Sequence, residues 1–375
     1  MIDFRYHLVS LMSVFLALAV GIALGAGPLK ETIGDTLTGQ VDQLRAEKED
    51  LRDQLASRTT ELSAADAAFS AVTPALLDGV LSERRVALVE VADVDPAVLE
   101  EVVARLTEAG ATITATVQVT DAWTDPEQHT FRQTLAGTLV DYLDPVPAED
   151  AGTGTELAEA LAQALTVAVP ADPDTLAETS GVILQLLSES ALISYEGDVT
   201  VPADAVVVLA GPTVGIEEVE DAALATASEA PEEAEAGQEQ LDAQLGAALQ
   251  IGLAVQARST GAVVAGGVLG EDTLISRVRQ DETAVTRLST VESVHTLTGQ
   301  VSVPLALSAR IAGTVGHFGP SESASAPMPP RVVLPPVERV ATVPDVVPPV
   351  DGSTDAGAVD PGATPEVSPA PPGEG

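Results

Sequence analysis

The sequence predicts an α/β protein in which an N-terminal membrane helix and a coiled-coil stalk precede a domain with a mostly parallel sheet. Three observations predict it: an uncharged apolar stretch at 8–27, a heptad repeat over 37–69, and strand patterns that alternate with helix patterns beyond residue 80. These features divide the chain into segments. We expect a membrane anchor at 1–29, a stalk at 30–72, an α/β domain at 80–319 and a disordered tail at 320–375.

The apolar stretch at 8–27 (LVSLMSVFLALAVGIALGAG) carries no charged side chain. As a helix it rises about 30 Å, which is enough to cross the hydrocarbon core of a bilayer. A cleaved signal peptide is the alternative, but its apolar region is usually only about 7–15 residues long, so the length favours a retained anchor with lipid as its partner. The flanking charge is slightly positive before the stretch and slightly negative after it. We therefore expect a cytoplasmic N-terminus and an extracytoplasmic domain in a single-pass protein of the cell membrane.

A heptad repeat follows the anchor. Its positions, spaced alternately by four and three residues, are Leu37, Val41, Leu44, Lys48, Leu51, Leu55, Arg58, Leu62, Ala65 and Phe69. Charged residues fill the positions between them, which favours a coiled-coil seam over an amphipathic helix packed on its own domain. We expect a homo-oligomer through 37–69, with Lys48 and Arg58 setting the register at a cost in stability. Pro74 and Gly79 are expected to break the helix.

The region after residue 80 alternates strands and helices. Residues 86–92 are typical of a buried strand, Asp95-Pro96 supplies an N-cap and a first-turn proline, and 111–119 is the next strand. Strand, helix and strand in this order favour a parallel right-handed crossover. Further helices are expected at 126–143, 155–168, 174–192, 239–258, 272–279 and 298–315, and further strands at 205–210 and 261–265.

Two segments differ in composition from the domain. Residues 217–239 hold nine carboxylates and no basic residue, which predicts a mobile acidic insertion. From Pro320 onward the chain holds fourteen of its 26 prolines and too little apolar surface to offset chain entropy, which predicts a disordered tail. Within that tail, the apolar patch at 331–334 is a candidate for docking on a partner.

Composition excludes several classes of function. The net charge of −40 and the pI near 4.1 are opposite to the basic surface that binds phosphates, so nucleic acid is not an expected partner. Because the chain has no cysteine, disulfides, thiolate metal sites and thiol nucleophiles are excluded. The acidic surface itself argues for solubility before any specific cation role.

Few residues suggest chemistry. The glycine-rich turn at 264–270 has the spacing Gly-Gly-x-x-Gly and is followed by two acids, so a tight turn with a helix cap is favoured over a nucleotide site. The turn at 211–215 follows a buried strand, where α/β sheets often bind ligands. The histidines and methionines are scattered, at His7, His129, His295, His317, Met1, Met12 and Met328. His295 with Glu292, and His317 in Gly-His-Phe-Gly, are candidate ligands or bases, although a lone histidine is more often structural. We expect no enzyme and no cofactor, and the sequence assigns no metal ligands.

Four features together resemble the MctB family of actinobacterial envelope proteins. They are the opening Asp3-Phe4-Arg5-Tyr6-His7-Leu8 running into the span, the leucine stalk from Leu37, the strand VALVEVAD and the late Gly-His-Phe-Gly. The resemblance covers about residues 1–319. It implies a role in copper transport and copper homeostasis, with copper ions as a partner, and it carries no residue-level ligands across.

Three hypotheses follow. The first is a membrane-anchored envelope protein of copper homeostasis that acts in efflux or channel assembly. One span is not a helical-bundle transporter, so such a role requires an oligomer or partners. The second is an oligomeric envelope scaffold without transport or enzymatic activity. The third is an enzyme or small-ligand binder that uses the loops after the parallel strands, which a polar pocket with converging carboxylates and a histidine would favour.

Overall fold

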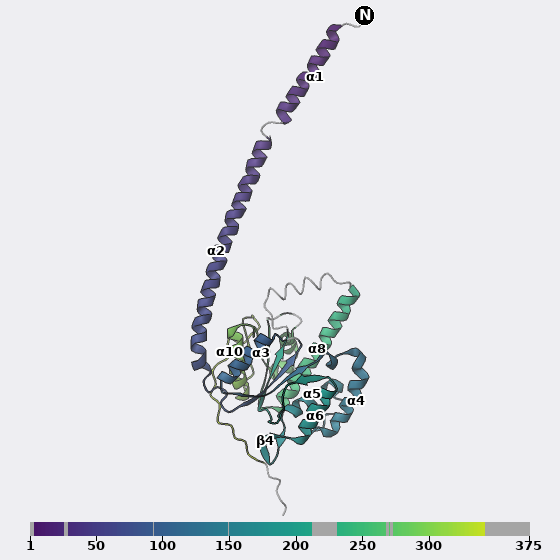
Figure 1. Ribbon diagram of the computed structural model, residues 1–375, viewed down its shortest axis with the longest axis vertical. Helices are drawn as coiled ribbons and strands as arrows, with labels where there is room; N and C mark the ends of the chain where they lie inside the picture. The colour runs from purple at the N-terminus through teal and green to yellow at the C-terminus, as the bar shows by residue number, and fades with distance from the viewer. Residues whose placement is uncertain are drawn as a thin grey trace, which may run out of the picture.

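The computed structural model describes residues 4–25, 29–92, 94–148, 150–211, 231–267, 270 and 273–341, with side chains except at 24–25, 29–38 and 231–236. Two long helices precede the domain, α1 (Phe4–Gly25) and α2 (Leu29–Leu77). The second projects from the domain as one extended rod (Figure 1).

The stalk helix continues past its proline. We expected a break at Pro74, but α2 runs on to Leu77 with Pro74 inside it. A proline one turn before the end removes only one backbone donor, and the Pro74 carbonyl still accepts from Asp78 N at 2.9 Å. The helix ends where Gly79 adopts a φ of 70°, a left-handed conformation that glycine favours after a helix.

The domain contains a seven-stranded sheet in the order β5-β2-β1-β6-β7-β8-β9. All neighbouring strands are parallel except β5, which pairs antiparallel with β2, so the predicted mostly parallel sheet is confirmed. The strands are β1 (Arg85–Val91), β2 (Thr112–Val119), β5 (Ile193–Tyr195), β6 (Ala205–Ala210), β7 (Ala262–Gly266), β8 (Ser289–Val291) and β9 (His317–Phe318).

Helices cover both faces of the sheet (Figure 1). One apolar core lies between the sheet and α4 (His129–Leu139), α5 (Thr153–Thr166), α6 (Glu178–Glu189), α8 (Pro231–Arg258) and α9 (Leu274–Gln280). The second core lies on the opposite face, under α3 (Pro96–Glu108), α10 (Leu297–Ile311) and the C-terminal end of α2. As expected, Asp95 caps α3, because its side chain accepts from Ala97 N at 2.8 Å.

One crossover has the reverse hand. Helices α3 and α10 pack against each other on the same face of the sheet. The connection through α3 steps from β1 to β2, toward the β5 edge, whereas the connection through α10 steps from β8 to β9, toward the opposite edge. The two connections therefore differ in hand. Because α8 and α9 lie on the other face and step in the direction of β9, they share the hand of the α3 connection. The connection β8-α10-β9 thus has the opposite hand to the other three. Because crossovers between parallel strands are almost always right-handed, we infer that this connection is the left-handed one.

Several boundaries differ from expectation. A two-stranded hairpin, β3 (Ala168–Val169) and β4 (Asp172–Leu176), occupies residues that we assigned to the ends of two helices. Helix α8 begins at Pro231, eight residues before the expected Glu239, so 231–239 is helical while 217–230 lies outside the described residues. The last helix ends at Ile311 and not at Val315, because the chain must return to form β9.

The ordered chain extends beyond the expected boundary at residue 320. Phe318 forms a parallel bridge with Ala326, and Met328 and Leu334 pack against the core under α3 and α10. We call residues 327–341 the strap. Of the apolar patch at 331–334, a candidate for docking on a partner, Leu334 packs against this chain's own domain, whereas Val333 is 80% exposed. Residues 342–375 lie outside the described part.

A close backbone approach at the start of α10 gives a stability prediction. A Cβ built on Gly299 would lie 2.1 Å from the Ser293 carbonyl oxygen, whereas one on Gly181, in α6, meets nothing within 4 Å. We expect Gly299→Ala to destabilise the domain by about 1–3 kcal/mol, because overpacking forces a backbone shift. Gly181→Ala should stabilise it by about 0.5–1 kcal/mol, because alanine is the better helix former. Urea unfolding followed by circular dichroism measures both, and equal effects would contradict the contact.

Candidate functional site

The first helix exposes an unbroken apolar surface. Residues 4–23 form a candidate membrane span with a mean hydropathy of 2.0, none of it buried inside the protein. Its large side chains stand open to the surroundings, with Phe15 62% and Leu16 69% exposed. A surface of this kind is stable only when lipid or another protein covers it. This helix is compatible with a single-pass membrane protein.

The stalk exposes a row of leucines. Val41, Leu44, Leu51, Leu55 and Leu62 are all exposed, between 43% and 68%. Leu37 of the same heptad has no described side chain. Ion pairs within the helix connect Arg45 with Asp42 (3.3 Å), beside the row, and Arg58, a heptad position of the row itself, with Glu61 (2.9 Å). An exposed leucine row flanked by charges is the surface that a partner helix buries in a coiled coil.

The strand order creates a switch point between β1 and β6. From β1 the chain proceeds to β2 on one side, whereas from β6 it proceeds to β7 on the other, so α3 and α8 leave the two strands on opposite faces. Ligands of open parallel sheets bind at the carboxyl ends of the strands beside such a point. The fold therefore places a candidate site at Val91 and Ala210.

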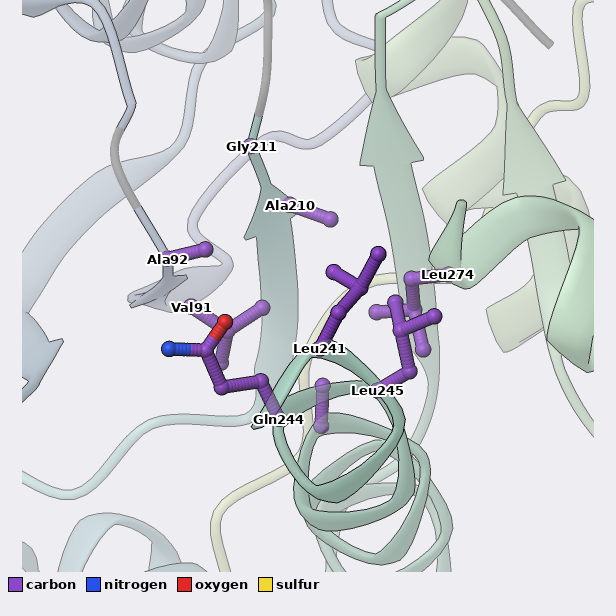
Figure 2. Close-up of a pocket in the computed structure, with 9 residues that line it drawn as sticks. Val91, Ala92, Ala210, Gly211, Leu241, Gln244, Leu245 and Leu274 are labelled. Atoms are coloured by element: carbon purple, nitrogen blue, oxygen red, sulfur yellow. The ribbon is translucent and has the colours of Figure 1, made fainter. Parts of the chain in front are cut away.

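A cavity of about 230 Å³ lies at this position. Figure 2 shows leucines of α8 and α9 pointing into it beside β6, with the Gln244 side chain turned toward the end of β1. The lining residues are Val91, Ala92, Ala210, Gly211, Leu241, Gln244, Leu245, Ala248 and Leu274. Ala92 has a φ of 62°, an uncommon conformation for a residue with a Cβ. Because Gln244 is the one polar side chain among these residues, the lining offers burial and one amide, and no acid or base.

A smaller hollow adjoins the cavity on the other side of Gln244. It lies against the loop after β2, including Asp121 and Trp123. Two glutamines connect α8 to this loop: Gln240 Nε2 donates to Thr124 Oγ at 3.0 Å, and Gln244 Nε2 makes a longer contact of 3.5 Å with Asp121 Oδ1. The polar groups of this hollow thus position α8 against the loop.

The two turns singled out in the sequence have different outcomes. Of 211–215, only Gly211 lies within the described residues, and it lines the cavity. At the second turn, Thr273 caps α9, because its side chain accepts from Ser276 N, and its hydroxyl donates to the Gly270 carbonyl at 3.1 Å. The expected helix cap is confirmed there, whereas 268–269 and 271–272 lie outside the description.

The candidate metal ligands are dispersed over the fold. His7 and Met12 lie in α1, His129 is exposed at the start of α4, and Met328 packs on the domain. Met1 lies outside the described residues. Among the residues that the structure describes, no group of three or more histidine, cysteine, aspartate or glutamate side chains could hold a metal ion.

Glu292 forms a buried ion pair that the sequence did not reveal. Its partner is Arg279 on α9, and their side chains are 1% and 8% exposed. Ser321 donates to the same carboxylate through its Oγ (2.5 Å) and its backbone N (3.2 Å). Such a pair is stable only when its remaining donors are satisfied, and Arg279 also donates to the Thr290 hydroxyl and to Ser323 Oγ.

His317 belongs to this network. Its Nε2 lies 3.1 Å from the Val285 carbonyl and its Nδ1 lies 3.0 Å from Thr290 Oγ. A carbonyl can only accept, so Nε2 carries the proton and Nδ1 accepts from the hydroxyl. Burial, together with the nearby positive charge of Arg279, lowers the pKa of His317, while the bond to Val285 opposes the change. Both ring nitrogens are engaged, so the imidazole is structural here.

A wide groove of about 790 Å³ runs along β2 and β5, beside α3. Glu90, Glu100 and Glu196 line it without a basic side chain among the lining residues, and burial raises the pKa of Glu90. The groove is an acidic, open face of the sheet. A combination of carboxylates with a histidine would favour an enzyme, and the residues that line this groove include no histidine.

Comparisons with known proteins point to one family. A family model described as "Copper transport outer membrane protein, MctB" matches residues 1–329. Proteins named "Copper transporter MctB" from Mycobacterium bovis (strain ATCC BAA-935 / AF2122/97) and Mycobacterium tuberculosis (strain ATCC 25618 / H37Rv) are each 27% identical over 330 residues, which is 86% of this chain and 98% of theirs. The match includes α1, α2 and the domain, and it ends within the strap.

The half-buried imidazole of His317 predicts that the stability of the domain depends on pH. A lowered folded pKa means that the unfolded chain binds the proton more tightly, so the contribution of His317 to stability is present above the ordinary value of 6.5 and is lost as pH falls below it. We expect His317→Gln to lose less stability than the wild type between pH 7.5 and 5.5. Urea unfolding at each pH measures this slope. His129→Gln, which removes an exposed imidazole, should keep the wild-type slope; identical slopes in all three proteins would contradict the role of His317.

Proposed function

Because this chain belongs to the MctB family, we propose that it is a single-pass, membrane-anchored envelope protein that serves copper homeostasis as an oligomeric component of an efflux or channel assembly. The family and the names of its relatives support a copper transport-related envelope protein. The efflux or channel role, the membrane topology and the oligomer are our proposals. Copper is the cargo in this role.

The observation that carries the proposal is the succession of two exposed apolar surfaces within the matched residues. Residues 4–23 are long and apolar enough to span a bilayer, and none of this surface is buried inside the protein. The leucine row of α2 follows directly in the chain. A membrane surface and a helix-pairing surface in series support an anchored assembly. We propose that the N-terminus is cytoplasmic and the α/β domain extracytoplasmic, in keeping with the charges that flank the span.

Self-association explains how a chain with one candidate span among its described residues takes part in transport. A single helix encloses no path for an ion, whereas several copies joined along 37–69 bring several spans together. Lys48 and Arg58 interrupt the apolar row, and charged residues at such positions restrict register and oligomer state. The proposed pairing is therefore in register and parallel, since every copy leaves the same membrane.

A scaffold without transport activity is the second candidate. It would use the same anchor and stalk to hold the α/β domain at the cell envelope. The apolar cavity and the acidic groove, which combine no carboxylates with a histidine among their lining residues, suit binding better than catalysis. Stable envelope partners together with copper-independent phenotypes would favour this function.

Metal accumulation in a strain that lacks the gene tests the copper role. We expect higher cellular copper and lower copper tolerance than in the parent strain, both restored by the intact gene. Cellular zinc, measured in the same samples, is the control for a general envelope defect. Unchanged copper accumulation and tolerance would reject the copper role and favour the scaffold.

A matched pair of substitutions tests self-association. Leu51→Glu places a carboxylate in the seam, whereas Ala46→Glu places one on an exposed position outside it. Burying a leucine is worth roughly 1.5–3 kcal/mol per chain, so Leu51→Glu should raise the dissociation constant at least about tenfold. Analytical ultracentrifugation in detergent measures the change.

The same two variants connect assembly to copper. At equal amounts in the membrane fraction, Ala46→Glu should restore copper tolerance to the deletion strain and Leu51→Glu should not. If both restore it, the seam is dispensable for the proposed role. If neither variant alters the oligomer, the coiled coil itself is rejected.

A further inference from the structure

The C-terminal end of α2 is capped by a residue distant in sequence. The last four carbonyls of a helix have no partner within it, and α2 has no basic residue in its last turn. Arg331 supplies both a hydrogen-bond donor and a positive charge. Its Nε donates to the carbonyl of Leu76, in the last turn, at 3.1 Å, and its Nη2 to the carbonyl of Asp78, just past the helix end, at 2.7 Å. Its positive charge also lies where the helix dipole favours a cation.

The domain also donates a hydrogen bond to the strap. Arg84, the residue before β1, is only 7% exposed, and its Nη2 donates to the Pro335 carbonyl at 2.7 Å. A buried guanidinium that loses its acceptor is costly. The surface at the α2–β1 junction therefore presents a cationic donor that requires a carbonyl from an extended chain.

A second strap arginine fixes the far end of the contact. Arg339 Nη2 donates to the Glu83 carbonyl at 2.8 Å and pairs with Asp204 Oδ2 at 2.5 Å. The side chains of this pair are 20% and 18% exposed, so the pair is better shielded than an ordinary surface ion pair. Asp204 also accepts from Arg85 N at 2.8 Å, which holds the carboxylate in place.

Apolar contacts and chain stiffness complete the interface. Met328 and Leu334 pack on the core under α3 and α10, and Pro329 is buried. Five of the fifteen strap residues are proline. Proline restricts the backbone to extended conformations, so the strap loses less entropy on docking than an ordinary chain would.

We propose that the junction of α2 and β1 is a binding site for an extended, proline-rich peptide that carries arginines, and that the strap is its resident ligand. Residues 76–84 and Asp204 form the site. Occupancy caps α2 and joins it to the sheet, and so fixes the stalk to the domain. The family match ends at residue 329, so the site lies in the matched part of the chain while Arg331, Pro335 and Arg339 lie beyond it.

Hydrogen exchange on the full chain tests the site. In Arg331→Gln/Arg339→Gln, the amides of residues 76–84 should exchange several-fold faster than in the wild type. Arg277→Gln/Arg287→Gln removes the same charge from largely exposed arginines and should leave this exchange unchanged. The buried strand 205–210 is the reference for folding; if it loses protection, Arg331→Gln alone replaces the double variant.

A peptide added in trans separates a binding site from a merely local effect. A synthetic peptide of residues 327–341 should bind the Arg331→Gln/Arg339→Gln chain in isothermal titration calorimetry and slow the exchange of residues 76–84 again. The same peptide with both arginines replaced by glutamine should do neither. Unchanged exchange in the double variant, or equal binding of the two peptides, would overturn the proposal.

Discussion

The complete burial of the central strands is the constraint on which the rest of the structure depends. Every residue of β6 and of β7 is buried, and parallel strands of this kind require helices on both faces. On one face α5 and α8 supply that cover, and on the other α10 does so together with α3. The end of α2 joins the second face: its last residue, Leu77, is fully buried, and so is Leu81 in the turn that follows. The last turn of the stalk is therefore part of the domain's core.

The parts of the fold that depend on local pattern could be predicted. The uncharged run and the heptad repeat both predict long helices, which the structure has as α1 and α2, and the all-apolar run 205–210 predicts the buried strand β6. Asp95-Pro96 predicts the start of α3. The short strands β5, β8 and β9 could not be predicted, because two or three residues give no periodicity and form only where a neighbour already exists. The hand of the β8-α10-β9 crossover depends on which face of the sheet α10 covers. That face is decided by packing against α3 and the sheet, and not by the local sequence of α10.

The candidate sites likewise divide into features that local sequence predicts and features that depend on how distant elements pack. The position of the switch-point cavity follows from the strand order, which one sequence does not reveal, although the sequence does predict a turn at Gly211 after a buried strand. The sequence makes Glu292 and His317 candidate ligands or bases, but their partners, Arg279 and Thr290, come from other elements. The composition of the strap predicts a disordered tail, because it cannot bury a core of its own. It is ordered because the domain supplies the apolar surface and the acceptors that it lacks.

The length of the stalk carries a consequence for the geometry of the envelope. A helix of 49 residues is about 74 Å long at 1.5 Å per residue. Because its last turn packs on the domain, the rod sets the distance between bilayer and domain in the proposed topology. An upright rod in that topology holds the acidic domain away from the lipid headgroups, by far more than the roughly 8 Å over which charges interact at physiological salt. The layer of the envelope that the domain meets is then set by the number of heptads and not by attraction to the membrane.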